Sequence, residues 1–325
     1  MEEKSLRDRM NEIMDVLEKG IRDVFESGTY ETYLKTMSRF HNYSMNNTML
    51  IYLQKPDATR VAGYQAWQRK FHRSVRKGEK GIRILAPCPF KKTVPDEDSP
   101  DLSGSGANAP SSKIITVPAF RPVTVFDVSQ TSGQPLPELV HPLKGDVEGY
   151  RAFHEALQNV SPVPIIYEDL PSDMDGFYSR NDKTITIRKG MSEVQTVSAL
   201  VHEIAHARLH DALPEDPGEW KDGRTMEVEA ESVSYAVCSY YGIETGENSF
   251  GYIASWSKDK DLPELKNSLS TIVRASSGLI TEIDRAREEL AQSRLPSMDE
   301  LLAAFPDIPV EVVGNGSRLG KEACL

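Results

Sequence analysis

The sequence predicts an α+β fold in two parts, and three observations support this prediction. Apolar residues recur at helical spacing in long segments at both ends of the chain, beginning with residues 5–26. Short runs rich in β-branched residues lie between the helical segments and indicate small sheets. The sequence His-Glu-Ile-Ala-His, at residues 202–206, lies inside an apolar run of helix-forming residues. We therefore expect an amino-terminal domain of helices and a small sheet. A second domain would then hold a short sheet, this helix and a glutamate-bearing helix.

Composition and charge limit the class of protein. With 325 residues, 39% of them hydrophobic and 27% charged, the chain is long enough for two domains and ordinary for a soluble globular protein. The amino terminus lacks the apolar segment of a secretory signal, and no apolar run approaches the roughly 20 residues that span a bilayer. Cys88, Cys238 and Cys324 are far apart, which argues against disulfides or a cysteine metal site. We expect a cytoplasmic protein with no membrane partner.

The amino-terminal domain is predicted over residues 1–135. Residues 95–112 are rich in Pro, Ser, Gly and Asp and lack hydrophobic periodicity, so we expect a flexible insertion between two strands there. Prolines at 135, 137 and 142 indicate a linker over 130–144. Helices are expected at 5–26, 31–41, from 46 or 47 to 55, and at 63–71, and strands at 82–85, 114–117 and 123–128.

The second domain is predicted over residues 145–292. An acidic loop at 211–222 separates the helix that carries His-Glu-x-x-His, which begins at Ser192, from a helix at 224–241. Other helices are expected at 147–160 and 263–291, the latter with Gly278 as a candidate break, and strands at 163–167, 176–179 and 184–187. The tail, residues 293–325, gives no clear pattern.

His202 and His206 are four residues apart on the predicted helix, so they share a face and can hold one metal ion together. Glu203 is placed to act as general base toward a water on that metal. The alternative is a helix whose histidines pack in the core or face solvent. We favour the metal site because the motif lies in a strand–helix context that supports such a site. The expected cofactor is one zinc ion per chain.

Two histidines leave a tetrahedral zinc site one protein ligand short. The next predicted helix carries Glu227 and Glu231, four apart on one face, whereas Glu229 points elsewhere. One of the pair would bind zinc while the other accepts the outer N–H of a ligand histidine. We choose Glu227 as the ligand and Glu231 as its supporting residue. The reverse order and a merely solvated acidic face are the alternatives.

These residues together indicate peptide hydrolysis. Zinc would polarise a substrate carbonyl, and Glu203 would take a proton from the attacking water and return it to the leaving amine. The segment 176–179 could add the substrate peptide as an extra strand, or could be an ordinary packed edge strand. His210, one turn beyond His206, is expected to be a surface histidine or one that supports a ligand.

Positive charge gathers in the amino-terminal domain, although the net charge of the chain is −11. Residues 55–92 carry eleven basic side chains against two acidic ones, so this segment is +9 and the rest of the chain −20. Cations that follow phosphates, interleaved with rings that stack on unpaired bases, suit a single nucleic-acid strand. The alternative, favoured for any one aromatic residue, is a solvated lysine face around core rings. The candidate DNA contacts are Arg60, Tyr64, Trp67, Lys70, Arg73, Arg76, Lys77 and Lys80.

The metal motif resembles a known family. The sequence from His202 to His210, followed by Glu227-x-Glu-Ala-Glu231, is similar to the ImmA/IrrE-type zinc metallopeptidases over about residues 145–245. In such glutamate zincins an acidic or amide residue four positions after the ligand glutamate supports a histidine. The resemblance therefore implies a zincin-like domain with Glu227 as ligand and Glu231 as support.

A second resemblance covers about residues 5–130. Phe40-His-x-Tyr-Ser-x-Asn-Asn47 and Val75-x-Lys-Gly-Glu-Lys-Gly-Ile resemble the amino-terminal domain of ArdC-type antirestriction proteins. That family, associated with conjugative plasmids and other mobile elements, joins a single-stranded-DNA-binding domain to a metallopeptidase domain. The insertion at 95–112 and the carboxy-terminal tail depart from its pattern.

Three functional hypotheses follow from the sequence. The leading one is a cytoplasmic, DNA-associated zinc metallopeptidase of the antirestriction type, with single-stranded DNA and a protein or peptide substrate as partners. The second is a protein of a mobile element that shields single-stranded DNA and in which the zinc domain is mainly structural. The third is a peptidase that cleaves a transcriptional repressor, with the first domain as a docking module. The oligomeric state is not indicated.

Overall fold

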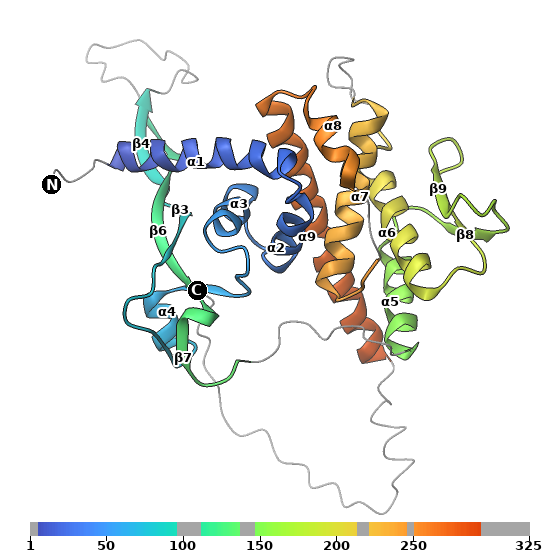
Figure 1. Ribbon diagram of the computed structural model, residues 1–325, viewed down its shortest axis with the longest axis horizontal. Helices are drawn as coiled ribbons and strands as arrows, with labels where there is room; N and C mark the ends of the chain where they lie inside the picture. Colours follow the sequence, from blue (N-terminus) through green and yellow to red (C-terminus); the bar gives the residue numbers. More distant parts are fainter. Residues whose placement is uncertain (1–5, 96–111, 137–146, 213–220, 246–249, 294–325) are drawn as a thin grey trace, which may run out of the picture.

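The computed structural model describes residues 6–95, 112–136, 147–212, 221–245 and 250–293, and it mixes helices with small sheets, as an α+β fold requires (Figure 1). The helices are α1 (Leu6–Glu26), α2 (Tyr30–Arg39), α3 (Met45–Gln54), α4 (Tyr64–Arg69), α5 (Val147–Val160), α6 (Glu193–Leu209), α7 (Gly223–Tyr240), α8 (Ile253–Ser257) and α9 (Leu262–Ser293). Short 3-10 helices cover Val128–Gln130 and Phe250–Tyr252.

Among the residues that the structure describes, the strands form four small sheets. Their order is β1-β6-β3, β8-β10-β9, β2-β7 and β4-β5. The strands are β1 (Val61–Gly63), β2 (Arg73–Val75), β3 (Ile82–Pro87), β4 (Phe90–Pro95), β5 (Ser112–Val117), β6 (Phe120–Asp127), β7 (Thr131–Gly133), β8 (Ile165–Glu168), β9 (Gly176–Ser179) and β10 (Thr184–Arg188). No helix among the described residues is long and apolar enough to cross a bilayer.

Most predicted elements lie within a few residues of the observed ones, and the differences have simple causes. Strands β1, β2 and β7 have three residues each, too few to show an alternating pattern. Strand β7 lies inside the linker predicted over 130–144, so that linker cannot begin at residue 130. Helix α9 continues through Gly278 because Leu279, Ile280 and Ile283 beyond it are buried in the core. Residues 96–111 of the predicted insertion and 294–325 of the tail lie outside the described residues.

Two side chains of α3 complete the outer edge of strand β3. The Asn47 amide donates to the carbonyl of Leu85 at 2.9 Å and accepts from its N–H at 2.8 Å. Gln54 makes the same pair of bonds with Arg83, both at 2.9 Å. Because unpaired backbone groups at a sheet edge invite pairing with another chain, these amides satisfy β3 and also fix α3 against the sheet.

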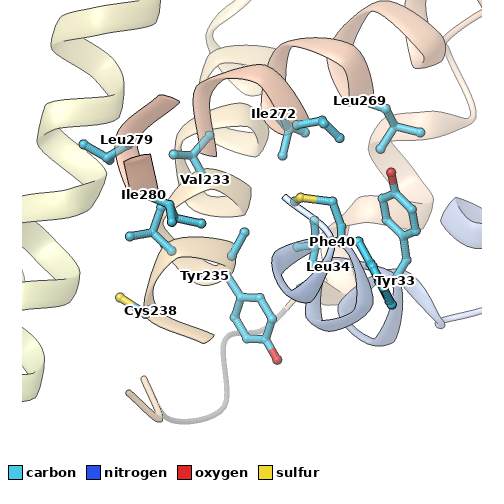
Figure 2. Packing of buried hydrophobic residues seen from close by; sticks show 14 of the residues in the cluster. Tyr33, Leu34, Phe40, Val233, Tyr235, Cys238, Leu269, Ile272, Leu279 and Ile280 are labelled. Atoms are coloured by element: carbon cyan, nitrogen blue, oxygen red, sulfur yellow. The ribbon is translucent and has the colours of Figure 1, made fainter. Parts of the chain in front are cut away.

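The amino-terminal helices share a hydrophobic core with α7 and α9. Leu34 of α2 and Phe40 just after it belong to the same buried cluster as Val233 of α7 and Ile272 of α9 (Figure 2), and α2 packs on both helices. Two hydrogen bonds add to this packing, one from the Tyr30 hydroxyl to Ser232 (2.7 Å) and one from the Tyr235 hydroxyl to Glu31 (2.6 Å). In Figure 1, α7 and α9 stand between α1–α3 on one side and α5, α6 and the β8–β10 sheet on the other.

The β8-β10-β9 sheet positions α6. Strand β10 pairs in parallel with β8 and antiparallel with β9, so β9 is an edge strand. Ile185 and Ile187 of β10 are buried, and the chain turns from β10 into α6 within five residues. Helix α6 therefore lies against β9 and β10, with α7 packed on its other side.

We expect the Asn47 bonds to be needed for stability. Replacing Asn47 with Leu leaves the buried N–H and C=O of Leu85 without partners, which costs about 1–3 kcal/mol per unsatisfied group. Chemical denaturation of Asn47→Leu, with Asn46→Leu as the matched control, measures the effect. Equal unfolding free energies in the two variants would contradict this role of Asn47.

Candidate metal centre

Local sequence signals fix where α6 begins and which face it buries. Ser192 is its N-cap residue: its hydroxyl accepts from the amide of Gln195 at 3.3 Å, and Gln195 accepts from the Ser192 amide at 3.2 Å. This reciprocal pair is a capping box. Val197, Leu200, Val201 and Ile204 are buried, which holds the helix in the core and turns His202 and His206 toward α7.

His202, His206 and Glu227 bring three donor atoms together. The Nε2 atoms of His202 and His206 are 3.0 Å apart. The carboxylate of Glu227 lies 3.5 Å from Nε2 of His202 and 3.4 Å from Nε2 of His206. All three donor atoms lie within 4.8 Å of one another. Two imidazoles and one carboxylate form the donor set of many catalytic zinc sites. The residues therefore fit a metal ion.

Glu231 lies on the other side of His202. Its carboxylate is 3.3 Å from Nδ1 of His202, whereas Glu227 faces the Nε2 atom. A carboxylate at that outer nitrogen holds the ring in one orientation and one tautomer. The spacing alone left the order of Glu227 and Glu231 open, and the structure separates them by the nitrogen that each one faces.

Negative charge dominates the centre when no metal ion is present. Hydrogen bonds from His202 and His206 hold the pKa of Glu227 far below its usual value, although burial opposes this. Burial disfavours the charged form of His202, but Glu227 and Glu231 outweigh it and raise the pKa of His202 to about 10. A cation is thus favoured here, whether it is a proton on the imidazole or a metal ion.

Glu203 lies beside the three donors and is almost fully buried, with 7% of its surface exposed. Burial raises the pKa of its carboxyl, the two histidines oppose this, and the backbone of Tyr178 also hydrogen-bonds the carboxylate. Strand β9 passes close by at Gly176, where an added Cβ would lie 3.4 Å from Cγ of Glu203 and 2.8 Å from Cδ1 of Ile187. Only glycine allows so close an approach.

A cleft of about 690 Å³ opens over these residues. One wall is β9 with the turn that follows it, and the other is formed by α6 and the start of α7. The side chain of Phe177 on β9 is 40% exposed, and the described strands give β9 a partner on one side, β10. The cleft therefore has an edge strand beside the buried carboxylate of Glu203.

His206 also has a residue beside its outer nitrogen, His210, whose role the sequence left open between a surface histidine and one that supports a ligand. Nδ1 of His206 lies 3.1 Å from Nδ1 of His210, whose Nε2 lies 3.2 Å from the carboxylate of Glu229. Glu229 is fully buried and accepts from Lys221 at 2.7 Å and from Ser268 of α9 at 2.9 Å. His210 is buried too, so of the two roles expected for it the surface one is wrong. The four-residue step from His206 to His210 was the available signal.

The comparisons with known proteins agree in domain order. Residues 4–126 match the family model of the N-terminal domain of anti-restriction factor ArdC, and residues 159–241 match that of the IrrE N-terminal-like domain, Peptidase_M78. The chain joins an ArdC-type domain to an IrrE-like domain. This is the combination that the sequence motifs predicted.

Two solved structures and one further protein are similar to this chain. The crystal structure of metal-free antirestriction protein ArdC from plasmid R388 is 19% identical, covers 76% of this chain and 86% of that one, and gives a TM-score of 0.51, which shows a shared fold. For the Mn(II)-bound structure of that protein the identity is 20%, the coverage 78% and 86%, and the TM-score 0.45. An uncharacterized protein of Bacillus anthracis is 26% identical over 94% of this chain. The chain spans 56% of that relative's length.

The eight candidate DNA contacts of the ArdC-type domain differ in how far their side chains are exposed. Trp67 is fully buried and donates to the carbonyl of Phe126 at 2.8 Å, so its ring cannot stack on a base and its assignment as a contact is wrong. It was assigned by its place among lysines, but the helix turns its ring inward. Tyr64, Lys70, Lys77 and Lys80 are exposed. We call these four residues the basic surface.

The three arginines in that set have structural bonds. Arg73 donates to the hydroxyl of Thr131 at 2.7 Å and to its carbonyl at 3.2 Å, which ties β2 to β7. Arg76 donates to the carbonyl of Ser129 at 2.6 Å and to Glu79 at 2.7 Å. Arg60 is half-buried, and its backbone amide donates to Asp127. Their DNA contacts stay a prediction, but Arg73 and Arg76 also hold the fold.

The affinity of this centre for a metal ion should rise with pH. Because the pKa of His202 without metal is raised to about 10, the metal ion must displace a proton at every pH below that value. We expect apparent zinc affinity to rise about tenfold per pH unit between about pH 6 and 9, one proton being released. Competition with a chelator of known protonation constants measures this. An affinity that does not change over this range would contradict the proton-bound state of His202.

Proposed function

We propose that the chain is a DNA-associated metallopeptidase of the antirestriction type, acting in the cytoplasm with zinc as its metal ion. The observation that carries the proposal is the convergence of His202, His206 and Glu227 beside buried Glu203, in a cleft with an edge strand. Three such ligands with an adjacent carboxylate suit metal-assisted hydrolysis. The metal would be held by those three residues, with Glu231 orienting His202.

The protein's own residues would share the work of peptide hydrolysis. When bound, the metal ion supplies a Lewis acid that polarises the scissile carbonyl and makes water more acidic. Glu203 would take the proton of the attacking water and pass it to the leaving amine. Its raised pKa suits this work, because a proton carrier is most effective when its pKa lies close to the working pH. Strand β9 would hold the substrate backbone as an added strand, with Gly176 leaving room beside Glu203.

The ArdC-type domain would bind single-stranded DNA. Lys70, Lys77 and Lys80 are exposed cations that can follow phosphates, and the exposed ring of Tyr64 can stack on a base. The domain match supports DNA as the partner, and the exposed ring favours an unpaired strand. DNA binding would then bring the peptidase to a protein already on the DNA.

A second candidate function is a DNA-shielding protein with a structural metal site. It is favoured by the place of α7, which carries Glu227 on one side and packs against α2 through Tyr30 and Tyr235 on the other. A metal ion held by α7 would stabilise both parts of the chain. Cleavage of a transcriptional repressor is a third candidate that keeps the same chemistry and changes the substrate.

The Glu203→Gln variant separates these functions. We expect it to keep the metal ion, since Glu203 is not a ligand, and to lose cleavage of itself or of casein by at least about 100-fold. Zinc content and cleavage would be measured for wild type and variant, with and without an oligodeoxynucleotide. The matched control is Glu193→Gln, a change at the exposed start of the same helix.

Two results would contradict the peptidase. One is cleavage that persists undiminished in Glu203→Gln. The other is a zinc-loaded, DNA-binding wild type without cleavage, together with full protection of unmodified DNA from restriction by Glu203→Gln. That second result would favour the shielding protein.

A further inference from the structure

A buried chain of hydrogen bonds runs from His206 to α7, and we call it the relay. Nδ1 of His206 lies 3.1 Å from Nδ1 of His210, and Nε2 of His210 lies 3.2 Å from the carboxylate of Glu229. The side chain of His210 is 3% exposed and that of Glu229 0%, so bulk water does not compete for their bond. His202 differs, because the carboxylate of Glu231 faces its outer nitrogen directly. The two candidate ligand histidines are therefore supported in different ways.

The carboxylate of Glu229 acts as an acceptor in the relay. Nζ of Lys221 lies 2.7 Å from each of its oxygens, and the hydroxyl of Ser268 on α9 donates to one of them at 2.9 Å. An ammonium group can only donate, and its positive charge at this distance favours the ionised carboxylate. An ionised carboxylate has no proton to give. Nε2 of His210 therefore carries the proton of its bond with Glu229.

The proton positions on both rings follow from that one bond. A neutral imidazole with its proton on one nitrogen has a lone pair on the other. His210 then offers a lone pair at Nδ1, and His206 donates its own Nδ1–H to it. This leaves a lone pair on Nε2 of His206, the atom that lies 3.0 Å from Nε2 of His202 and 3.4 Å from Glu227. A metal ion at this centre needs a lone pair on that nitrogen.

The reverse proton order is unfavourable in two places. It sets a lone pair of His210 against the ionised carboxylate of Glu229, where no water can separate the two acceptors. It also puts a proton on Nε2 of His206, where the metal ion must bind. The order that satisfies the buried groups is thus the same order that leaves His206 ready for a metal ion.

We propose that Glu229 and His210 are positioning residues of the metal centre, which hold His206 in its metal-binding tautomer before the ion arrives. Lys221 and Ser268 take part by fixing the carboxylate of Glu229. A ligand histidine whose tautomer is already set does not have to move its proton when the ion binds. The inference rests on the metal site of the proposed function and does not depend on peptide cleavage or DNA binding.

Zinc affinity of the full chain, measured by competition with a chelator, tests the contribution of the relay. We expect Glu229→Gln and His210→Ala to weaken zinc binding about 10- to 100-fold, as when other residues that support a metal ligand are removed. His210→Asn should recover part of this loss, because its amide oxygen can replace Nδ1 as the acceptor for His206. The matched control is His154→Ala, which removes a partly buried histidine on α5 that bonds to Tyr167 outside the relay.

The proton positions are measured separately, by long-range proton–nitrogen NMR of the metal-free chain labelled with nitrogen-15 histidine. We expect the proton of His206 on Nδ1 and that of His210 on Nε2. In His210→Ala, His206 should lose this preference and populate both tautomers. A loss of packing alone lowers the unfolding free energy and leaves the tautomer of His206 unchanged, so the spectrum separates positioning from a purely structural role.

The outcomes separate this inference from the proposed function. If Glu229→Gln and His210→Ala bind zinc as tightly as wild type, the inference is wrong and the metal centre stands. A proton on Nε2 of His206 in the metal-free wild type, or an unchanged tautomer in His210→Ala, would also overturn it. If wild type binds no zinc, the metal centre and the inference are both wrong. A relay confirmed by both measurements, without cleavage that depends on Glu203, would contradict the peptidase alone.

Discussion

The candidate metal centre depends on the packing of α6 against α7. Two histidines on one helix cannot enclose a metal ion, so the third donor must come from an element held at a fixed distance. A hydrogen bond joins the two helices closely: the hydroxyl of Ser234 on α7 donates to the backbone carbonyl of Ser198 on α6 at 3.0 Å. The buried side chains of Val228 and Val233 keep α7 in place. Any change in this packing moves Glu227 away from the histidines.

Helix α7 also joins the two parts of the chain. Glu227 and Glu231 face α6, while Ser232 and Tyr235 bond to Tyr30 and Glu31 of the amino-terminal helices. The buried hydrophobic residues of both parts belong to one cluster. The division into domains at 1–135 and 145–292 stays a prediction, but the two parts are not independently packed. The candidate metal donor Glu227 and the contacts with the amino-terminal helices therefore lie on one helix.

The sequence predicted the elements of the site better than their surroundings. The pairs His202–His206 and Glu227–Glu231 could be grouped because helical spacing of four residues brings side chains to one face, and that rule is local, while their roles stay predictions. The contact of His210 with Glu229 could not be found in this way. It depends on how α6 packs against α7, and the two residues are 19 positions apart in the chain. A pattern of neighbouring residues does not predict which residues of two packed helices contact each other.

The same limit explains the differences in the ArdC-type domain. Trp67 was chosen for its neighbours in the sequence, but its burial is decided by contact with β6, whose Phe126 lies 59 residues away. The bonds of Arg73 to Thr131 likewise join distant residues. The β4 strand was missed because Lys91, Lys92 and Thr93 show no apolar alternation, and in the structure all three are exposed. An exposed strand leaves little hydrophobic signal.

The most direct test of the metal centre is X-ray absorption at the zinc edge, on the wild type and on two glutamate variants. We expect one zinc ion per chain, with two imidazole nitrogens and oxygen ligands and no sulfur. We also expect Glu227→Ala to lose the ion, while Glu231→Ala keeps it with an affinity about 10- to 100-fold weaker, as when a residue supporting a ligand is removed. Unchanged zinc binding in Glu227→Ala, or sulfur in the coordination shell, would contradict the proposed centre.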